Sequence, residues 1–198
     1  MTTKKRRPAA RADIDGRVLA RMNAFMRERT LARYLATRDA MLASPHYDPK
    51  CTVLPDAFRL VGRGLFHQVL AVVNRAMGNW LLNPGIHFLA SQAFSELGDE
   101  ERAEREAETE RTLLGGILMT GDGSPEHPYL VLRSADEYDV LARMGLRCRA
   151  HQVAYRSGRA FDALACDDGR DVWFDVTAPA VPGQARSARI YPFAPAAP

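Results

Sequence analysis

The chain has 198 residues, of which 46% are hydrophobic and 26% are charged, and its formal net charge is +3. This is the composition of an ordinary globular protein, so it excludes the disordered, collagen-like and membrane-spanning classes. The three cysteines are widely spaced and form no C-x-x-C pair, which argues against a disulfide framework and against a zinc site.

The N-terminal residues 1–11 form a basic tail that we expect to be disordered. Residues 1–33 hold ten Lys or Arg residues against three Asp or Glu residues, so the basic charge belongs to this end of the chain. Such a run usually improves solubility, and nucleic-acid binding through it is the alternative. No apolar stretch follows the run, so we expect no secretory signal, no membrane contact and a cytoplasmic location.

Residues 12–119 show helical periodicity. Apolar side chains such as Val18, Met22 and Phe25 recur at helical spacing within 15–44, which predicts one long helix or two shorter ones. Further helices are predicted at 55–61, 65–82, 86–97 and 100–119, with Gly64, Pro84 and Gly98 at their boundaries.

A regular spacing relates two of the predicted helical hairpins. Gly64 and Gly98 lie 34 residues apart, and Val69 is matched at the same interval by Ala103. The segment 94–103 resembles the tetratricopeptide consensus around its inter-helix turn, and that repeat has the same period. We therefore predict a tetratricopeptide-like helical region, with an ordinary helical bundle as the alternative.

The pattern changes after residue 119. A turn-rich linker at 120–125 begins a second predicted domain at 120–177, and a Pro/Ala-rich tail at 178–198 follows it. The linker contains Gly-Asp-Gly, which we interpret as a hinge because no phosphate-binding or calcium-binding motif surrounds it.

The second domain is predicted to combine strands with one helix. A strand at 129–132 precedes a helix that begins with Ser134 as N-cap and Glu137 as its capping-box partner, and that ends at Gly145. Three strands follow near 149–156, 160–166 and 171–176, joined by tight turns at Ser157-Gly158 and Asp168-Gly169. The predicted fold class is α+β, with N-terminal tetratricopeptide-like helical hairpins followed by a small βαβββ antiparallel-sheet domain.

Several short phrases between residues 45 and 177 form a set that can be compared as a whole. They are Tyr-Asp-Pro at 47–49, Gly-Asp-Gly-Ser-Pro at 121–125, Tyr-Leu-Val-Leu at 129–132, Asp-Glu-Tyr-Asp-Val-Leu at 136–141, Phe-Asp at 161–162 and Trp-Phe-Asp-Val at 173–176. As a set they resemble a bacterial domain-of-unknown-function family with a tetratricopeptide-like helical half before this module. The resemblance implies the same layout and implies no activity, since none is established for that family.

No catalytic motif stands out, so we predict a protein that is not an enzyme and needs no cofactor or metal. The sequence contains no H-E-x-x-H and no G-x-S-x-G, and its five histidines lack a second ligand at helical spacing. The alternative is a small enzyme or metal-dependent domain built on Asp136, Asp162 and Asp175, with Glu137 and Tyr138 nearby. That alternative requires the three aspartates to share one pocket.

The leading hypothesis is a protein-interaction module, an adaptor or scaffold that binds an unknown protein or peptide. Stacked helical hairpins would form a groove, and the α+β domain would cap the array. Polar and aromatic residues on an otherwise apolar array are the candidates for that groove, although Trp80 also fits a core position. The candidates are Asn74, Asn79, Trp80, His87 and Gln92.

Overall fold

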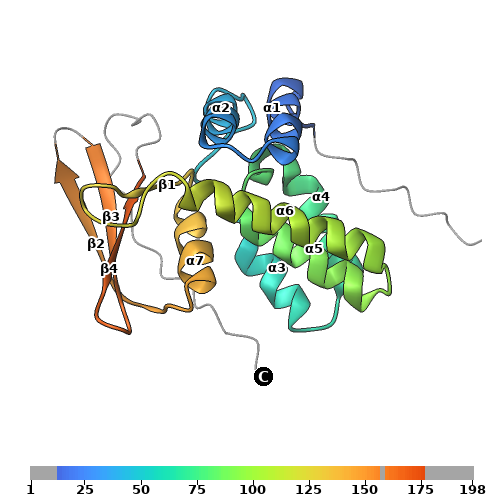
Figure 1. The fold of residues 1–198 in the computed structure, drawn as a ribbon. Coiled ribbons are helices and arrows are strands. Elements are labelled where there is room, and N and C mark those ends of the chain that lie inside the picture. Colours follow the sequence, from blue (N-terminus) through green and yellow to red (C-terminus); the bar gives the residue numbers. More distant parts are fainter. Residues whose placement is uncertain (1–12, 157–158, 177–198) are drawn as a thin grey trace, which may run out of the picture.

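The computed structural model describes residues 13–156 and 159–176, and within them the chain has an α+β fold. Helices make up the N-terminal half, and a four-stranded sheet lies at the other end of the molecule (Figure 1). This confirms the predicted α+β class with a helical N-terminal half. The two predicted tails and the predicted turn at Ser157-Gly158 lie outside the described residues.

The predicted helical segment at 15–44 consists of two helices, α1 (Gly16–Arg27) and α2 (Leu31–Leu42). The Asp15 side chain begins α1 by accepting a hydrogen bond from the Arg17 amide at 2.8 Å. Thr30 is the N-cap of α2, with its side chain accepting from the Arg33 amide. Glu28 has an extended backbone, so the chain turns between the two helices instead of continuing as one.

Four further helices form two hairpins with the same turn. They are α3 (Leu54–Val61), α4 (Phe66–Trp80), α5 (Pro84–Glu96) and α6 (Glu100–Leu118). Gly64 and Gly98 have φ values of 66° and 76°, which favour glycine. Equivalent backbone hydrogen bonds close the turns, from Leu65 to Leu60 at 3.0 Å and from Asp99 to Phe94 at 2.9 Å. The spacing of the two glycines thus corresponds to a repeated helix-ending turn.

The sheet is mixed, which corrects the predicted antiparallel sheet. Its strands are β1 (Tyr129–Leu130), β2 (Cys148–Arg156), β3 (Arg159–Cys166) and β4 (Asp171–Asp175), in the order β1-β4-β3-β2. Strands β2, β3 and β4 form the predicted antiparallel meander, whereas β1 is parallel to β4. The reason is that α7 (Ser134–Arg143) carries the chain back after β1, so β2 and β4 run in the direction of β1.

The start of α7 corrects the predicted capping box by one residue. Arg133 is the N-cap, and Ser134 is the first helical residue. The Asp136 carboxylate accepts the Leu132 and Arg133 amides at 2.9 and 3.1 Å, which is the role predicted for Glu137. Gly145 ends the helix with φ 70°, as predicted.

Helix α7 lies between the sheet and the helical layer (Figure 1). One buried cluster joins both halves of the chain, since it includes Phe25 and Leu113 from the helices together with Val140 of α7 and Phe174 of β4. A second cluster, with Val69, lies among α3, α4 and α5. Among the described helices, none combines the length and the apolar character needed to cross a bilayer.

Candidate binding cleft

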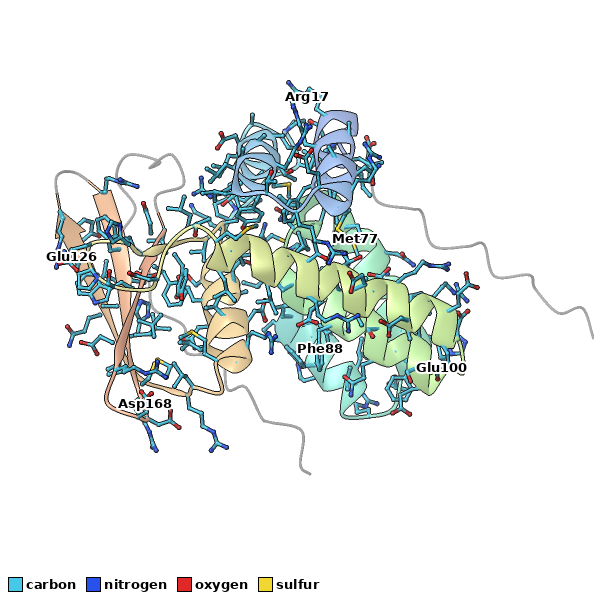
Figure 2. All side chains as sticks on the ribbon, in the orientation of Figure 1. Arg17, Met77, Phe88, Glu100, Glu126 and Asp168 are labelled. Atoms are coloured by element: carbon cyan, nitrogen blue, oxygen red, sulfur yellow. The ribbon has the colours of Figure 1, made fainter. Side chains whose placement is uncertain are left out.

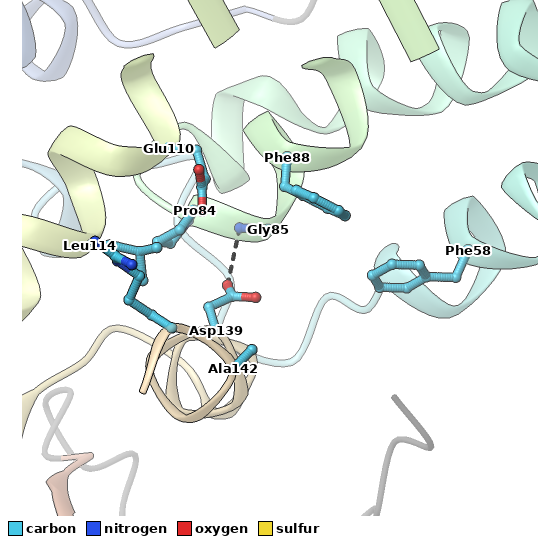
Figure 3. Close-up of a pocket in the computed structure, with 9 residues that line it drawn as sticks. Phe58, Pro84, Gly85, Phe88, Glu110, Leu114, Asp139 and Ala142 are labelled. Atoms are coloured by element: carbon cyan, nitrogen blue, oxygen red, sulfur yellow. Dashed lines mark hydrogen bonds between the residues drawn. The ribbon is translucent and has the colours of Figure 1, made fainter. Parts of the chain in front are cut away.

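A cleft with a volume of about 180 Å³ opens where α3, α5, α6 and α7 meet (Figure 3). Its walls are mostly apolar, and its polar groups are two carboxyl groups, one guanidinium group and a backbone amide. The lining residues are Phe58, Pro84, Gly85, Phe88, Glu110, Leu114, Asp139, Ala142 and Arg143.

The segment Asn83-Pro84-Gly85 builds the floor of this cleft at the start of α5. The Asn83 side chain caps the helix by accepting from the Ile86 amide at 2.8 Å, and Pro84 suits the first helical turn because it needs no amide partner there. The Gly85 amide then donates to Asp139 Oδ2 at 3.0 Å. A Cβ atom on Gly85 would lie 2.8 Å from Asp139 Oδ1, so only glycine lets this carboxyl group approach the helix.

Asn83 also connects two acidic side chains of α7. Its Nδ2 donates to Asp136 Oδ1 at 2.8 Å and to Asp139 Oδ2 at 2.9 Å. Burial, and then the charge of Asp136, raises the pKa of Asp139 to about 7. Burial likewise raises the pKa of Glu110 across the cleft. The cleft therefore holds two carboxyl groups that are poorly solvated and would ionise more readily beside a cation.

Two phenylalanines form the apolar side of the cleft. Phe88 is 42% exposed on α5, and Figure 2 shows it on the helical layer away from the sheet. Figure 3 shows Phe58 beyond the Asp139 carboxyl group, which lies between the phenylalanines and α7. The lining includes no serine, cysteine or histidine, so its ionisable groups are the carboxyl groups of Glu110 and Asp139 and the guanidinium group of Arg143.

Two of the residues predicted to line a partner groove lie instead at the joint between the helical layer and α7. The Arg133 guanidinium lies over the ring of Trp80, 4.2 Å from its centroid, and donates to the Asn79 carbonyl oxygen at 2.7 Å. Asn79 also exchanges hydrogen bonds with the backbone of Asp48, which fixes the loop before α3. Trp80 is buried.

The structure does not gather the other three groove candidates on one surface. His87 is buried, with one ring nitrogen 2.6 Å from Glu106 Oε2 and the other 2.9 Å from the Leu81 carbonyl oxygen. Asn74 is exposed on α4 and Gln92 is partly buried on α5.

The three aspartates of the catalytic alternative are also apart. Asp136 caps α7, and Asp175 pairs with Arg159. Phe161 lies opposite Asp175 and Asp162 lies opposite Phe174, so the two aspartates point to opposite faces of the sheet. The condition that would favour a site on these three residues is therefore not met.

Comparison of the chain with family models, with curated proteins and with solved structures returns no match. The resemblance to a bacterial domain-of-unknown-function family therefore stays a prediction. The cleft residues Phe58, Phe88 and Asp139 were missed by sequence reasoning. The Asn83-Pro84-Gly85 helix start was the available signal, because glycine directly after such a start indicates close approach by another group.

Proposed function

We propose that the protein is a non-catalytic interaction module that binds a segment of another protein in the cleft among α3, α5, α6 and α7. The observation that carries the proposal is the exposed Phe88 beside the Asp139 and Glu110 carboxyl groups. Both acids are partly buried, and an exposed aromatic side chain next to such polar groups is typical of a surface that anchors a partner residue.

The partner segment is expected to present a Lys or Arg beside an aliphatic or aromatic residue. The cleft holds two carboxyl groups against the one guanidinium group of Arg143, so a cation complements it. The apolar neighbour would pack on Phe58 and Phe88. A cation near Asp139 also lowers the pKa of that group from about 7, so binding should release a proton near neutral pH and become tighter as the pH rises.

A peptide-display selection on the full-length protein tests this proposal. We expect enriched peptides that carry a basic residue next to an apolar one, and affinity that falls about tenfold or more in Phe88→Ser. The control is Leu97→Ser, which alters an equally exposed apolar side chain at the other end of α5 and should leave binding unchanged.

Enrichment of acidic peptides, or binding that Phe88→Ser does not weaken, would contradict the proposal. If the affinity for the peptide stays constant between pH 6 and 8, Asp139 does not release a proton on binding.

We also assign the protein to the cytoplasm. This is supported by Cys51, Cys148 and Cys166, which are all free thiols although Cys148 and Cys166 lie opposite each other on β2 and β3. Fractionation of host cells tests the assignment, and recovery outside the cytoplasm would contradict it.

A further inference from the structure

The side of the sheet that faces α7 carries two ionisable side chains among apolar ones. In the β2–β3 pair Val153 lies opposite Asp162 and His151 lies opposite Leu164, so His151 and Asp162 are diagonal neighbours on one face. Leu164 and Phe174 on the same face are fully buried. A histidine and an aspartate thus enter the layer where the main hydrophobic core is packed.

A third ionisable side chain reaches the same place from α7. Glu137 is fully buried, and one ligand atom from each of Glu137, His151 and Asp162 lies within 4.8 Å of the others. The three residues come from α7, β2 and β3, so the fold, and not a local motif, assembles the group. We call it the Glu-His-Asp cluster.

The separation of His151 and Asp162 fits two ligands of one metal ion better than it fits a hydrogen bond. His151 Nε2 and Asp162 Oδ1 are 3.2 Å apart, yet among the described residues neither of these buried atoms makes a hydrogen bond. The Asp162 side chain is 98% buried, because its exposed fraction is 2%. Two ligand atoms about 2.1 Å from one ion at angles of 90° to 110° are roughly 3.0 to 3.4 Å apart.

Energetics favour a cation at this position. A carboxylate taken out of water costs several kcal/mol unless a cation or hydrogen-bond donors compensate it. In the described part of the chain, the ion-pair partner of Asp162 is His151, which is charged only when it is protonated. A cation held by all three side chains would balance the charge of the buried Asp162 carboxylate. It would also bind His151 Nε2 and Asp162 Oδ1, which make no hydrogen bond among the described residues.

We propose that the Glu-His-Asp cluster binds a divalent transition-metal cation, with Zn²⁺ or Mn²⁺ as the matching ions. Imidazole nitrogen with carboxylate oxygen is a ligand set that suits these ions better than the softer thiolate-binding metals. Three protein ligands leave a further coordination position. His151 is the most exposed of the three and lies on the edge strand β2, so this position faces that edge. The proposal is independent of the cleft.

Calorimetric titration of the full-length protein, stripped with a chelator and then given Zn²⁺ or Mn²⁺, tests this site. We expect one ion per chain and a melting temperature that rises by several degrees at saturation. Asp162→Asn and His151→Gln should each weaken binding about 100-fold or more, since even indirect partners of metal ligands are worth 10- to 100-fold. The matched controls Asp171→Asn and His127→Gln alter exposed residues outside the cluster and should bind as the wild type does.

The melting temperature of each variant without metal shows whether the variant is folded. Without an ion, Asp162→Asn removes a buried carboxylate and should melt no lower than the stripped wild type. No binding of either ion by the wild type would overturn the proposal. Binding that survives both cluster substitutions and is lost when the three thiols are alkylated would also overturn it, because the ion would then belong to the cysteines.

Discussion

Helix α7 buries carboxylates against both of its neighbours, and the two sides satisfy them differently. On the side of the helical layer, Asp136 and Asp139 receive hydrogen bonds from Asn83 and from backbone amides. On the side of the sheet, Glu137 lies close to the His151 imidazole and to a second acid, Asp162. The first arrangement is completed by hydrogen-bond donors, whereas in the second the ligand atoms of three side chains face one another.

The comparison teaches that burial alone does not predict the role of an acid. Fixed donors stabilise a carboxylate without any ligand, so Asp136 has a structural role. A histidine nitrogen that lies beside two carboxyl groups supplies the kind of ligand set that metal sites use. The cleft at Asp139 lies between these cases, because one carboxyl oxygen accepts two hydrogen bonds and the group still faces a small opening.

The largest expected effect comes from removing the shared donor of the helical side. Asn83→Ala deletes the α5 cap and the donors to Asp136 and Asp139, leaving two acids poorly compensated. We expect a loss of about 3 kcal/mol in the free energy of unfolding, measured by urea denaturation. Asn74→Ala, an exposed change on α4, is the control and should stay within about 0.5 kcal/mol. A loss below about 1 kcal/mol for Asn83→Ala would show that this network contributes little.

A smaller effect is expected from filling the space between α5 and α7. In Gly85→Ala the new Cβ would lie 2.8 Å from Asp139 Oδ1, so the carboxyl group must shift and its bond to the Gly85 amide weakens. We expect destabilisation of about 1 to 2 kcal/mol, also from urea denaturation. Gly115→Ala in α6 meets no atom within 4 Å and should be neutral or stabilising, since alanine favours helices. Equal behaviour of the two variants would argue against the close approach.

The third expected effect is the pH dependence of stability due to Asp139. Its folded-state pKa of about 7 lies above the ordinary 3.8, so between these values the unfolded chain loses a proton that the folded protein keeps. The free energy of unfolding of the wild type should therefore fall as the pH rises from about 4 to about 7, and then level off. Asp139→Asn cannot ionise, so its stability relative to the wild type should increase across that window by a few kcal/mol, because each unit between the two pKa values is worth about 1.4 kcal/mol.

Denaturation at a series of pH values measures this difference, with the exposed Asp171→Asn as the matched control. A constant difference between Asp139→Asn and the wild type from pH 4 to pH 8 would be inconsistent with a raised pKa at Asp139.

Sequence-based prediction succeeded for features that depend on a few consecutive residues, such as helix-ending glycines. Gly64, Gly98 and Gly145 all end helices with positive φ, as their positions predicted. The capping box failed by one residue because the N-cap is set by the extended backbone of Arg133, and sequence offers both Asp136 and Glu137 as partners. That single-residue difference sends Glu137 to the sheet and Asp136 to the helical layer.

Part of the Glu-His-Asp cluster was accessible from the sequence. The turn predicted at Ser157-Gly158 implies that Arg156 lies opposite Arg159, and counting back along both strands from that pair puts His151 and Asp162 on one face. Glu137 was not accessible in this way, because its distance from β2 depends on how α7 packs across the sheet. The same reason explains the groove candidates, since helical periodicity cannot say whether Trp80 and His87 face solvent or another helix.

The sequence by itself determined the order and type of the elements, the repeated glycine turns and the α+β class, because these depend on spacing and backbone preferences within short segments. Only the tertiary structure decided that β1 is parallel to β4, that Phe88 and Asp139 share a cleft, and that Glu137 meets His151 and Asp162. These features join residues far apart in the chain. Packing fixes them through side-chain shape and through the cost of leaving buried charge uncompensated.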